Sequence, residues 1–231
     1  ENIIHSTADQ KKILVIGAGP SGMESARLLA MRGHHVEVWE KDKDIGGTVR
    51  VAALAYEPNG HLINYLKNSL NALGVKIKLS TIATAKSVQA FKPDHVIVAV
   101  GANRDAPSIK GKNSRNVFDG EQLRGLLFGS DINAAKKLSL LQQLILKIGR
   151  ASQLLRNISA LRFLSKIWMP ISKNIVVIGG DLVGLELAEF LVERGRTVKV
   201  LEPSGSLGPN LSIVRRSRVV HMLKEHGVDL L

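Results

Sequence analysis

Two stretches of this chain carry glycines at spacings that suit the binding of a phosphate-containing nucleotide. The first runs from Ile13 to Gly22 and the second from Ile175 to Gly184, and they align position by position without a gap. The alignment continues to an acid, Glu40 in the first stretch and Glu202 in the second. Glycines let backbone N–H groups approach a pyrophosphate, and an acid at this distance accepts hydrogen bonds from ribose hydroxyls. The pattern therefore predicts two dinucleotide sites, one in each copy.

Each residue of the first turn has its own predicted task. Gly17 makes the turn after a strand, Gly19 leaves room for the phosphates, and Gly22 lets the next helix pack against the strand. The helix N-terminus adds N–H donors and a partial positive charge, which favour an anion. Because a carboxylate such as Glu40 repels a 2′-phosphate, Glu202 indicates that the second copy prefers NAD(H) over NADP(H).

The second copy departs from the pattern at its middle glycine. Asp181 stands where the first copy has Gly19, so a negative charge lies where phosphates should pass. The carboxylate must point away, contact the phosphates through water, or weaken the site, because like charges at short range repel. The sequence leaves these three possibilities open.

The elements that position these turns are those of a parallel α/β fold. Four apolar, mostly β-branched residues before each turn predict a strand buried on both faces. A further buried strand is expected over 92–102, with its end over the dinucleotide. Helices are expected over 23–31, 61–73 and 212–226, and other strands over 36–39, 75–79 and from 228. We therefore predict an α/β fold with two Rossmann-like units and parallel sheets, plus a basic helical insert.

Composition narrows the class of protein. The chain has 231 residues, 45% of them hydrophobic, and no run of roughly 18 apolar residues, so we expect a globular, cytoplasmic protein. It has no cysteine, which excludes disulfides, thiolate metal sites and iron–sulfur ligation within this chain. His221 and Glu225 have a spacing that suits two metal ligands on a helix, but no third ligand is near, and we interpret them as a surface polar pair. No metal site is predicted.

The net charge of +12 is concentrated in the middle of the chain. Between residues 132 and 180 there is no acid, whereas Lys and Arg recur throughout. The apolar spacing predicts two amphipathic helices separated near Gly149. Such helices could lie on anionic lipid or hold a partner, but we favour a hairpin that packs on its own protein and leaves Lys and Arg in water. Membrane contact and specific nucleic-acid binding are therefore not expected.

The glycine turns and their surroundings resemble those of the pyridine-nucleotide-dependent flavoproteins. The narrower resemblance is to the C-terminal half of the 2,4-dienoyl-CoA reductase, 2-enoate reductase and trimethylamine dehydrogenase group, which are related to old yellow enzyme. It covers about residues 12–120 and 173–231, but not the insert. The residues that carry it are Gly17 to Glu24, Glu40, Gly46 to Ala53, Leu62, Leu66, Gly74-Val75, Pro93 to Gly101 and the second turn.

The resemblance implies a function and a division of the chain. Hydride would pass from NADH to FAD, and electrons would pass on to a barrel domain or subunit that holds FMN and an iron–sulfur cluster and reduces enoyl-type substrates. This chain would be the FAD- and NAD(H)-binding half. In the trimethylamine dehydrogenase branch ADP replaces FAD, so a non-redox ADP-binding scaffold is the alternative. The expected parts are a tail or linker at 1–10, an FAD (ADP)-binding unit at 11–120, the insert at 121–172 and an apparently truncated NAD(H)-binding unit at 173–231.

Matched by position, the resemblance also assigns cofactor contacts. Contacts to FAD or ADP are expected from Gly17, Gly19, Pro20, Ser21, Gly22, Glu40, Lys41, Gly47, Thr48, Ala83, Ala99 and Gly101. Contacts to NADH are expected from Gly179, Gly180, Asp181, Leu182, Val183, Gly184, Glu186 and Glu202, with Glu186 on the nicotinamide side. Hydride transfer between two cofactors requires no acid or base from the protein, so no catalytic residue is predicted.

Overall fold

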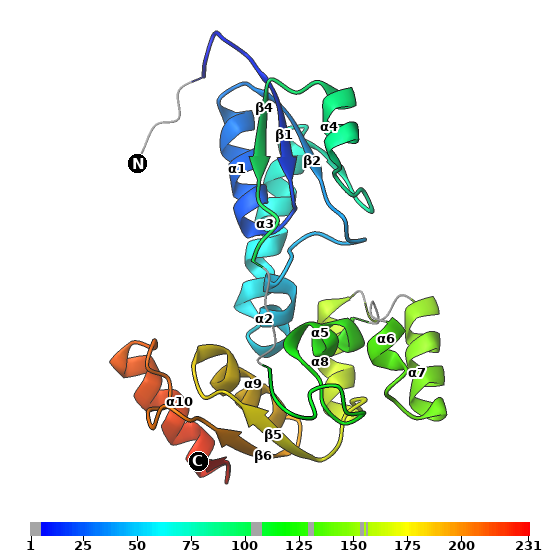
Figure 1. The fold of residues 1–231 in the computed structure, drawn as a ribbon. Coiled ribbons are helices and arrows are strands. Elements are labelled where there is room, and N and C mark those ends of the chain that lie inside the picture. The colour runs from blue at the N-terminus through cyan, green and yellow to red at the C-terminus, as the bar shows by residue number, and fades with distance from the viewer. Residues whose placement is uncertain (1–5, 103–107, 129–131, 153–154, 156) are drawn as a thin grey trace. The chain divides into compact units, whose positions relative to one another are not determined.

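The chain consists of two compact units, at 1–105 and 106–231, each with one parallel sheet (Figure 1). The structure is a computed structural model, and it describes residues 6–102, 108–128, 132–152, 155 and 157–231. Residues 1–5 of the predicted tail lie outside the described residues. The predicted α/β fold with parallel sheets is confirmed. The residues of the basic insert lie in the second unit, and the finer division into four parts remains a prediction.

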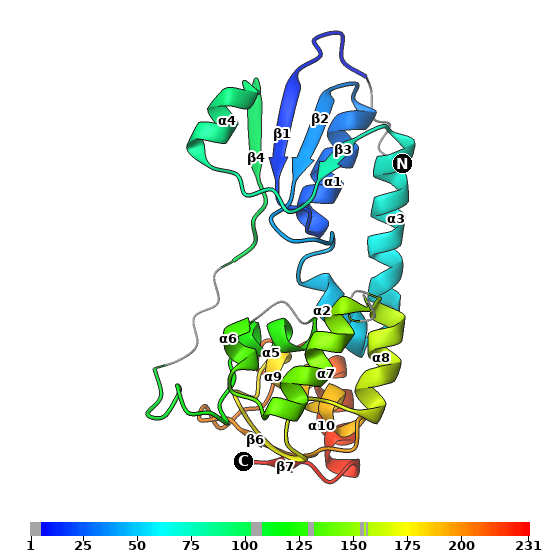
Figure 2. The ribbon, with the colours of Figure 1, turned by 90° about the vertical axis from the view of Figure 1, so that its right-hand side faces the viewer.

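The first unit is a four-stranded sheet with helices packed on it. Its elements are, in chain order, β1 (Lys12–Ile16), α1 (Pro20–Met31), β2 (His35–Trp39), α2 (Val49–Ala55), α3 (Pro58–Ala72), β3 (Lys76–Lys78), α4 (Ala85–Phe91) and β4 (His95–Val98). The strand order is β3-β2-β1-β4, and every pair is parallel. Ile13, Leu14 and Val15 of β1 are buried, as predicted for this strand. Helix α1 contacts β1, β2 and α3 (Figure 2). The turn between β1 and α1 follows the carboxyl end of β1, so it lies at the carboxyl edge of the parallel sheet.

The second unit repeats this arrangement with three strands. Its elements are α5 (Gly120–Leu127), α6 (Ile132–Ala135), α7 (Leu140–Ala151), α8 (Ile158–Ile167), β5 (Asn174–Ile178), α9 (Leu182–Val192), β6 (Thr197–Leu201), α10 (Ile213–Glu225) and β7 (Asp229–Leu230). The strand order is β5-β6-β7, again parallel. Val177, Val198 and Val200 are buried, and α9 contacts β5, β6 and α10. The second glycine turn therefore has the same setting as the first.

Two strands are less buried than the sequence predicted. Val176 and Ile178 of β5 are 55% and 58% exposed, because α9 contacts β5 on the opposite face, where Val177 is buried. Val96 and Val98 of β4 are also exposed, because the face of the sheet that they share is not fully covered. The expectation of burial on both faces was wrong for these strands. Apolar residues indicate that a strand can be buried, but burial also requires that other elements pack on both of its faces.

The insert forms the two predicted helices, α7 and α8, but they separate later than expected. Gly149 lies inside α7 rather than between the helices. A Cβ atom at Gly149 would come within 3.1 Å of the Leu155 side chain, so this glycine allows a close contact instead of breaking the helix. Arg194 follows α9, is buried, and donates from its Nε to Oγ of Ser165 in α8 at 2.9 Å. Burial lowers the pKa of Arg194. One side of the insert thus packs on its own protein, as predicted.

Candidate functional site

Glu40 is held at the carboxyl end of β2 by the backbone of the first glycine turn. Its carboxylate is buried and accepts hydrogen bonds from the N–H groups of Ala18 at 2.6 Å and Asp42 at 2.9 Å. The turn is fixed to the same strand, because Gly17 N–H donates to the Trp39 carbonyl at 2.7 Å. Hydrogen bonds therefore join the acid and its strand directly to the glycine turn.

Glu202 makes matching hydrogen bonds in the second unit, although it is less buried than Glu40. Its carboxylate accepts from Gly180 N–H at 2.7 Å and Ser204 N–H at 2.9 Å, and Gly179 N–H donates to the Leu201 carbonyl at 2.8 Å. Every partner stands at the position that aligns with its counterpart in the first unit. The backbone hydrogen bond from Gly180, followed by the hydrogen bonds from Ser204, lowers the pKa of Glu202, so this acid is ionised at neutral pH.

The three positions of the first turn are occupied by glycine for different physical reasons. Gly17 has φ +104°, and a Cβ there would lie 2.4 Å from the Ala99 carbonyl oxygen. A Cβ at Gly22 would lie 1.9 Å from the Gly17 carbonyl oxygen. A Cβ at Gly19 would meet no protein atom within 4 Å. Gly17 and Gly22 are required by the fold, whereas the space beside Gly19 is open. The expected contact between Gly19 and the pyrophosphate of FAD or ADP remains a prediction.

Alanine at two of these glycines should separate folding from cofactor binding. We expect Gly22→Ala to destabilise the first unit by about 2 kcal/mol or more, because its Cβ must displace backbone. Gly19→Ala should melt like the unchanged protein but retain less flavin, since its Cβ enters the open space. Thermal melting without cofactor and flavin content after purification measure the two effects. Equal destabilisation by both substitutions would show that Gly19 is also needed for packing.

The loop after β2 covers the first turn. Gly46 N–H donates to the Ala18 carbonyl at 2.8 Å, and a Cβ at Gly47 would lie 3.3 Å from the Gly19 Cα. Thr48 then precedes α2, which begins at Val49. The structure therefore brings the predicted residues Gly47 and Thr48 to the turn, although α1 and β2 separate them from Gly19 in the sequence.

The other predicted residues of the first unit lie at the same edge of the sheet. Pro20 and Ser21 begin α1, whose N-terminus has no side-chain cap. Lys41 is exposed beside Glu40, and Ala83 follows the Thr81 segment, where the Thr81 N–H donates to the Glu40 carbonyl at 2.8 Å. Ala99 follows β4 and lies close to the first turn. Gly101, two residues later, has φ +79°.

In the second turn the fold explains all three glycines. A Cβ at Gly184 would lie 1.8 Å from the Gly179 carbonyl oxygen, as at the matching position of the first turn. A Cβ at Gly180 would come within 2.8 Å of the Glu202 Cβ, so this glycine leaves room for the Glu202 side chain. Gly179 has φ +106°, a backbone conformation that favours glycine.

Asp181 adopts nearly the same backbone conformation as Gly19, the aligned residue of the first unit. Its φ and ψ are −87° and −170°, against −72° and 176° at Gly19. Its carboxylate accepts hydrogen bonds from the Asn210 side-chain amide at 2.6 Å and from the Asn210 N–H at 3.3 Å. The hydrogen bond from the Asn210 side chain lowers the pKa of Asp181, so the group is ionised at neutral pH. The side chain is therefore engaged by the protein itself.

Asn210 and Gly208 are site residues that the sequence analysis missed. Gly208 N–H donates to the Gly180 carbonyl at 2.7 Å, as Gly46 N–H does to the Ala18 carbonyl. In the gapless alignment of the two copies, Gly208 falls on Gly46 and Asn210 falls on Thr48. Continuing that alignment past Glu202 would have found both. In each unit this loop contacts the glycine turn through a backbone hydrogen bond, and in the second unit the Asn210 and Asp181 side chains add a further contact.

The remaining predicted residues of the second unit lie on α9. Leu182 and Val183 begin the helix and are partly exposed. Glu186 forms an ion pair with Arg215 of α10. The pairing joins α9 to α10, and the predicted place of Glu186 near the nicotinamide remains a prediction.

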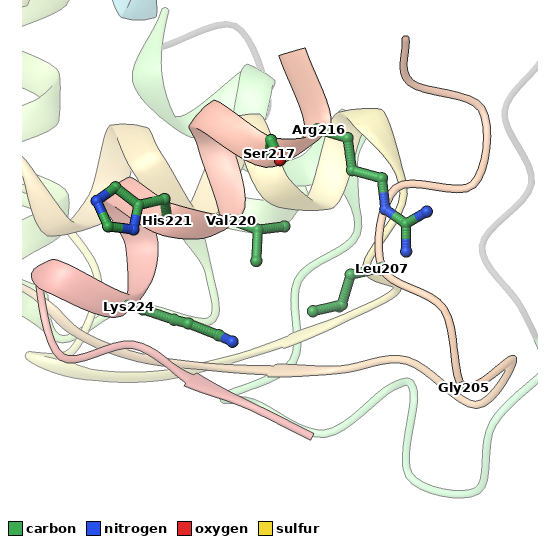
Figure 3. A pocket seen from close by; sticks show the side chains of 7 residues that line it. All are labelled: Gly205, Leu207, Arg216, Ser217, Val220, His221 and Lys224. Carbon is green, nitrogen blue, oxygen red and sulfur yellow. The ribbon is translucent and has the colours of Figure 1, made fainter. Parts of the chain in front are cut away.

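An open hollow of about 540 Å³ lies between α10 and the loop after Glu202 (Figure 3). The side chains of Arg216 and Lys224 extend toward this loop, and Arg216 donates to Ser206 Oγ at 3.0 Å. No residue that lines the hollow belongs to a glycine turn. On the same helix His221 Nε2 lies 3.3 Å from Glu225 Oε1, and the described residues contain no group of three potential metal ligands.

A parallel strand, a glycine turn, a helix and a terminal acid, present twice, define this chain as a dinucleotide-binding α/β protein. The family model of pyridine nucleotide-disulphide oxidoreductases matches residues 11–231. The chain belongs to this family, as the resemblance in the sequence predicted.

Known relatives support this assignment, and the chain covers less than a third of the length of each relative described here. It is 30% identical over 233 residues to bilirubin reductase of Mediterraneibacter gnavus, covering 100% of this chain and 30% of the relative. It is 27% identical to NADH oxidase of Thermoanaerobacter brockii, covering 95% of this chain and 28% of that protein. A solved structure of 2-naphthoyl-CoA reductase is similar with a TM-score of 0.75 and 28% identity, over 99% of this chain and 29% of that one.

Membership of the family makes the chain an FAD- and NAD(P)H-binding oxidoreductase module. Bilirubin reductase, NADH oxidase and 2-naphthoyl-CoA reductase each extend well beyond the part that this chain matches. The disulphide chemistry in the family's description does not belong to this chain, which has no cysteine.

Proposed function

We propose that this chain takes hydride from NADH onto FAD and passes electrons to a barrel domain or subunit that holds FMN and an iron–sulfur cluster and reduces an enoyl-type substrate. The observation that carries the proposal is the pair of identical acid sites, in which Glu40 and Glu202 each accept two backbone N–H bonds beside a glycine turn. The names of two relatives, cinnamate reductase and NADH oxidase, support the substrate class and the donor.

The residues of the chain would bind and orient the two cofactors. In the first unit, the space beside Gly19 would take the pyrophosphate, and Glu40 would accept the adenosine ribose hydroxyls. In the second, Glu202 would hold the ribose of NADH and exclude a 2′-phosphate, because it is ionised. Bound FAD supplies the hydride acceptor, and the protein supplies position and exclusion of water. No side chain need transfer a proton in this step.

The alternative is a non-redox scaffold in which the first unit holds ADP and the second holds no nucleotide. The observation in its favour is Asp181, an ionised carboxylate at the position where the first unit leaves open space for phosphates. This alternative predicts a colourless protein that does not respond to NADH.

Identification of the bound small molecule separates the two functions. We would denature the purified chain and analyse the released compound by mass spectrometry. FAD, together with bleaching of the flavin absorbance by NADH, is the result expected for the redox module. Release of ADP with no flavin would establish the scaffold and overturn the proposal.

Glu202→Ala tests whether the second unit holds the nicotinamide nucleotide. We expect the preference for NADH over NADPH to fall about fivefold or more, because the charge that repels a 2′-phosphate is lost. The ratio of kcat/KM for the two donors in flavin reduction measures this preference. Asp229→Ala is the matched control, since Asp229 is an exposed acid on the neighbouring strand that pairs with Lys199. Unchanged discrimination in Glu202→Ala would place the donor elsewhere.

A further inference from the structure

Helix α7 of the insert has two apolar faces. Leu146 is buried, and Gly149 allows a close contact with Leu155, which follows the helix in the sequence. On the other side five aliphatic residues fall within an arc of about 140°, at about 100° per residue. They are Leu140, Leu141, Leu144, Ile145 and Ile148, with exposed fractions of 84%, 68%, 53%, 38% and 60%. We call these five residues the α7 outer face.

The α7 outer face corrects one expectation from the sequence. A hairpin packed on its own protein was expected to leave Lys and Arg in water, but this helix leaves a continuous aliphatic surface exposed as well. Contiguous exposed apolar surface on a soluble protein is uncommon and marks a place of contact with something else. Leu146 on the opposite side of α7 is 4% exposed, so the helix buries one side and exposes the other.

The charged residues of the stretch 132–180, which carries the α7 outer face, have one sign. Lys147 lies about 20° beyond Leu140 around the helix, at the border of the outer face, and is exposed. Lys136, which precedes the helix, is also exposed. No acid occurs between residues 132 and 180. Lys137 differs, because its Nζ donates to Gln122 Oε1 at 3.0 Å and to the Val117 carbonyl, and so stabilises the fold.

The neighbouring helix α8 continues the same chemistry. It exposes Phe163 at 65% and Ile167 at 69%, with the exposed Lys166 between them in the sequence, while Leu161 and Ser165 on its other side are buried. Both helices of the insert therefore expose apolar and basic side chains and no acidic ones.

We propose that the α7 outer face docks on an anionic lipid surface. Leu and Ile side chains would enter the boundary between headgroups and acyl chains, and Lys147 would reach the anionic headgroups while its alkyl stem covers apolar surface. Protein interfaces are enriched in aromatic residues and Arg and use polar groups for specificity. The α7 outer face has only aliphatic side chains bordered by Lys, which favours lipid over a protein partner.

The contact would be peripheral. Among the described residues, no helix is long and apolar enough to cross a membrane. A short helix held against a folded unit on one side can present only its other side to a bilayer, so binding should be reversible and should depend on anionic lipid.

Sedimentation with lipid vesicles tests the proposal on the whole chain. We expect the protein to pellet with vesicles of phosphatidylcholine and phosphatidylglycerol at physiological salt, and not with phosphatidylcholine alone. Leu141→Gln with Leu144→Gln should reduce pelleting at least about tenfold, because it removes exposed aliphatic surface without changing charge. Lys147→Glu should reduce it as well, through the loss of attraction to anionic headgroups.

A matched control separates this docking from the general attraction of a basic protein to anionic vesicles. Ile213 on α10 is 85% exposed, so Ile213→Gln makes the same chemical change elsewhere, and we expect it to bind vesicles like the unchanged protein. Circular dichroism should show all variants folded, since the substituted side chains are exposed. Absence of pelleting, pelleting without anionic lipid, or equal binding by the Leu141/Leu144 variant would overturn the proposal, and the last result would assign vesicle binding to net charge.

Discussion

Replacing Glu40 by alanine is expected to yield a protein that purifies without flavin. The Glu40 carboxylate is buried and is the acceptor for the N–H groups of Ala18 and Asp42. Its removal leaves two donors without their acceptor, at about 1–3 kcal/mol each. The same oxygens are placed for the ribose hydroxyls of FAD, so the affinity for FAD should fall roughly a hundredfold through loss of hydrogen bonds to a charged group.

Flavin absorbance after purification and FAD titration of the apoprotein measure this effect. Glu40→Gln retains one oxygen acceptor and should keep part of the flavin, which makes the prediction testable even if the alanine variant folds poorly. Glu37→Ala is the control on the same strand, because Glu37 also has two partners, Lys78 Nζ at 2.7 Å and Trp39 Nε1 at 2.6 Å, away from the turn. Flavin retained by Glu40→Ala would show that Glu40 does not hold the cofactor.

Replacing Asp181 by glycine is expected to tighten NADH binding by about tenfold, a difference of about 1.4 kcal/mol. In the first unit the same backbone position is Gly19, where the space is open. In the second, an ionised carboxylate stands beside the path of a pyrophosphate and is held there by Asn210. Removing it abolishes the repulsion between like charges and restores the turn of the first unit.

Two further variants separate charge from shape. Asp181→Asn keeps the size of the side chain but removes its charge, and should recover most of the gain in affinity if repulsion is the cause. Asn210→Ala releases the Asp181 carboxylate and should change NADH binding less than Asp181→Gly does. Titration of NADH fluorescence measures all three affinities. Weaker or unchanged binding by Asp181→Gly would mean that Asp181 contributes to the site rather than opposing it.

The sequence predicted the turns and their acids because their contacts are local. A strand, a glycine turn and the start of a helix follow one another directly, and the acid is delivered by the next strand, so residue types at fixed spacing describe the geometry. The internal repeat strengthened this inference, since both backbone N–H bonds to the Glu40 carboxylate recur at the Glu202 carboxylate with the same offset. The roles of Gly17 and Gly22 in the turn follow from the same local geometry.

Only the tertiary structure decided the features that depend on distant neighbours. Asp181 contacts Asn210, which lies beyond α9 and β6 in the sequence. The internal repeat aligns Asn210 with Thr48, but only the structure shows that the Asn210 side chain holds the Asp181 carboxylate. The exposure of Val176 and Ile178 depends on whether another element packs on their face of the sheet. The α7 outer face could not be told from a buried one, because hydrophobic periodicity identifies a face that can be covered and not the element that covers it. Short-range spacing therefore determined the chemistry of each turn, and long-range packing determined which charged and apolar groups remain free to meet a ligand or a surface.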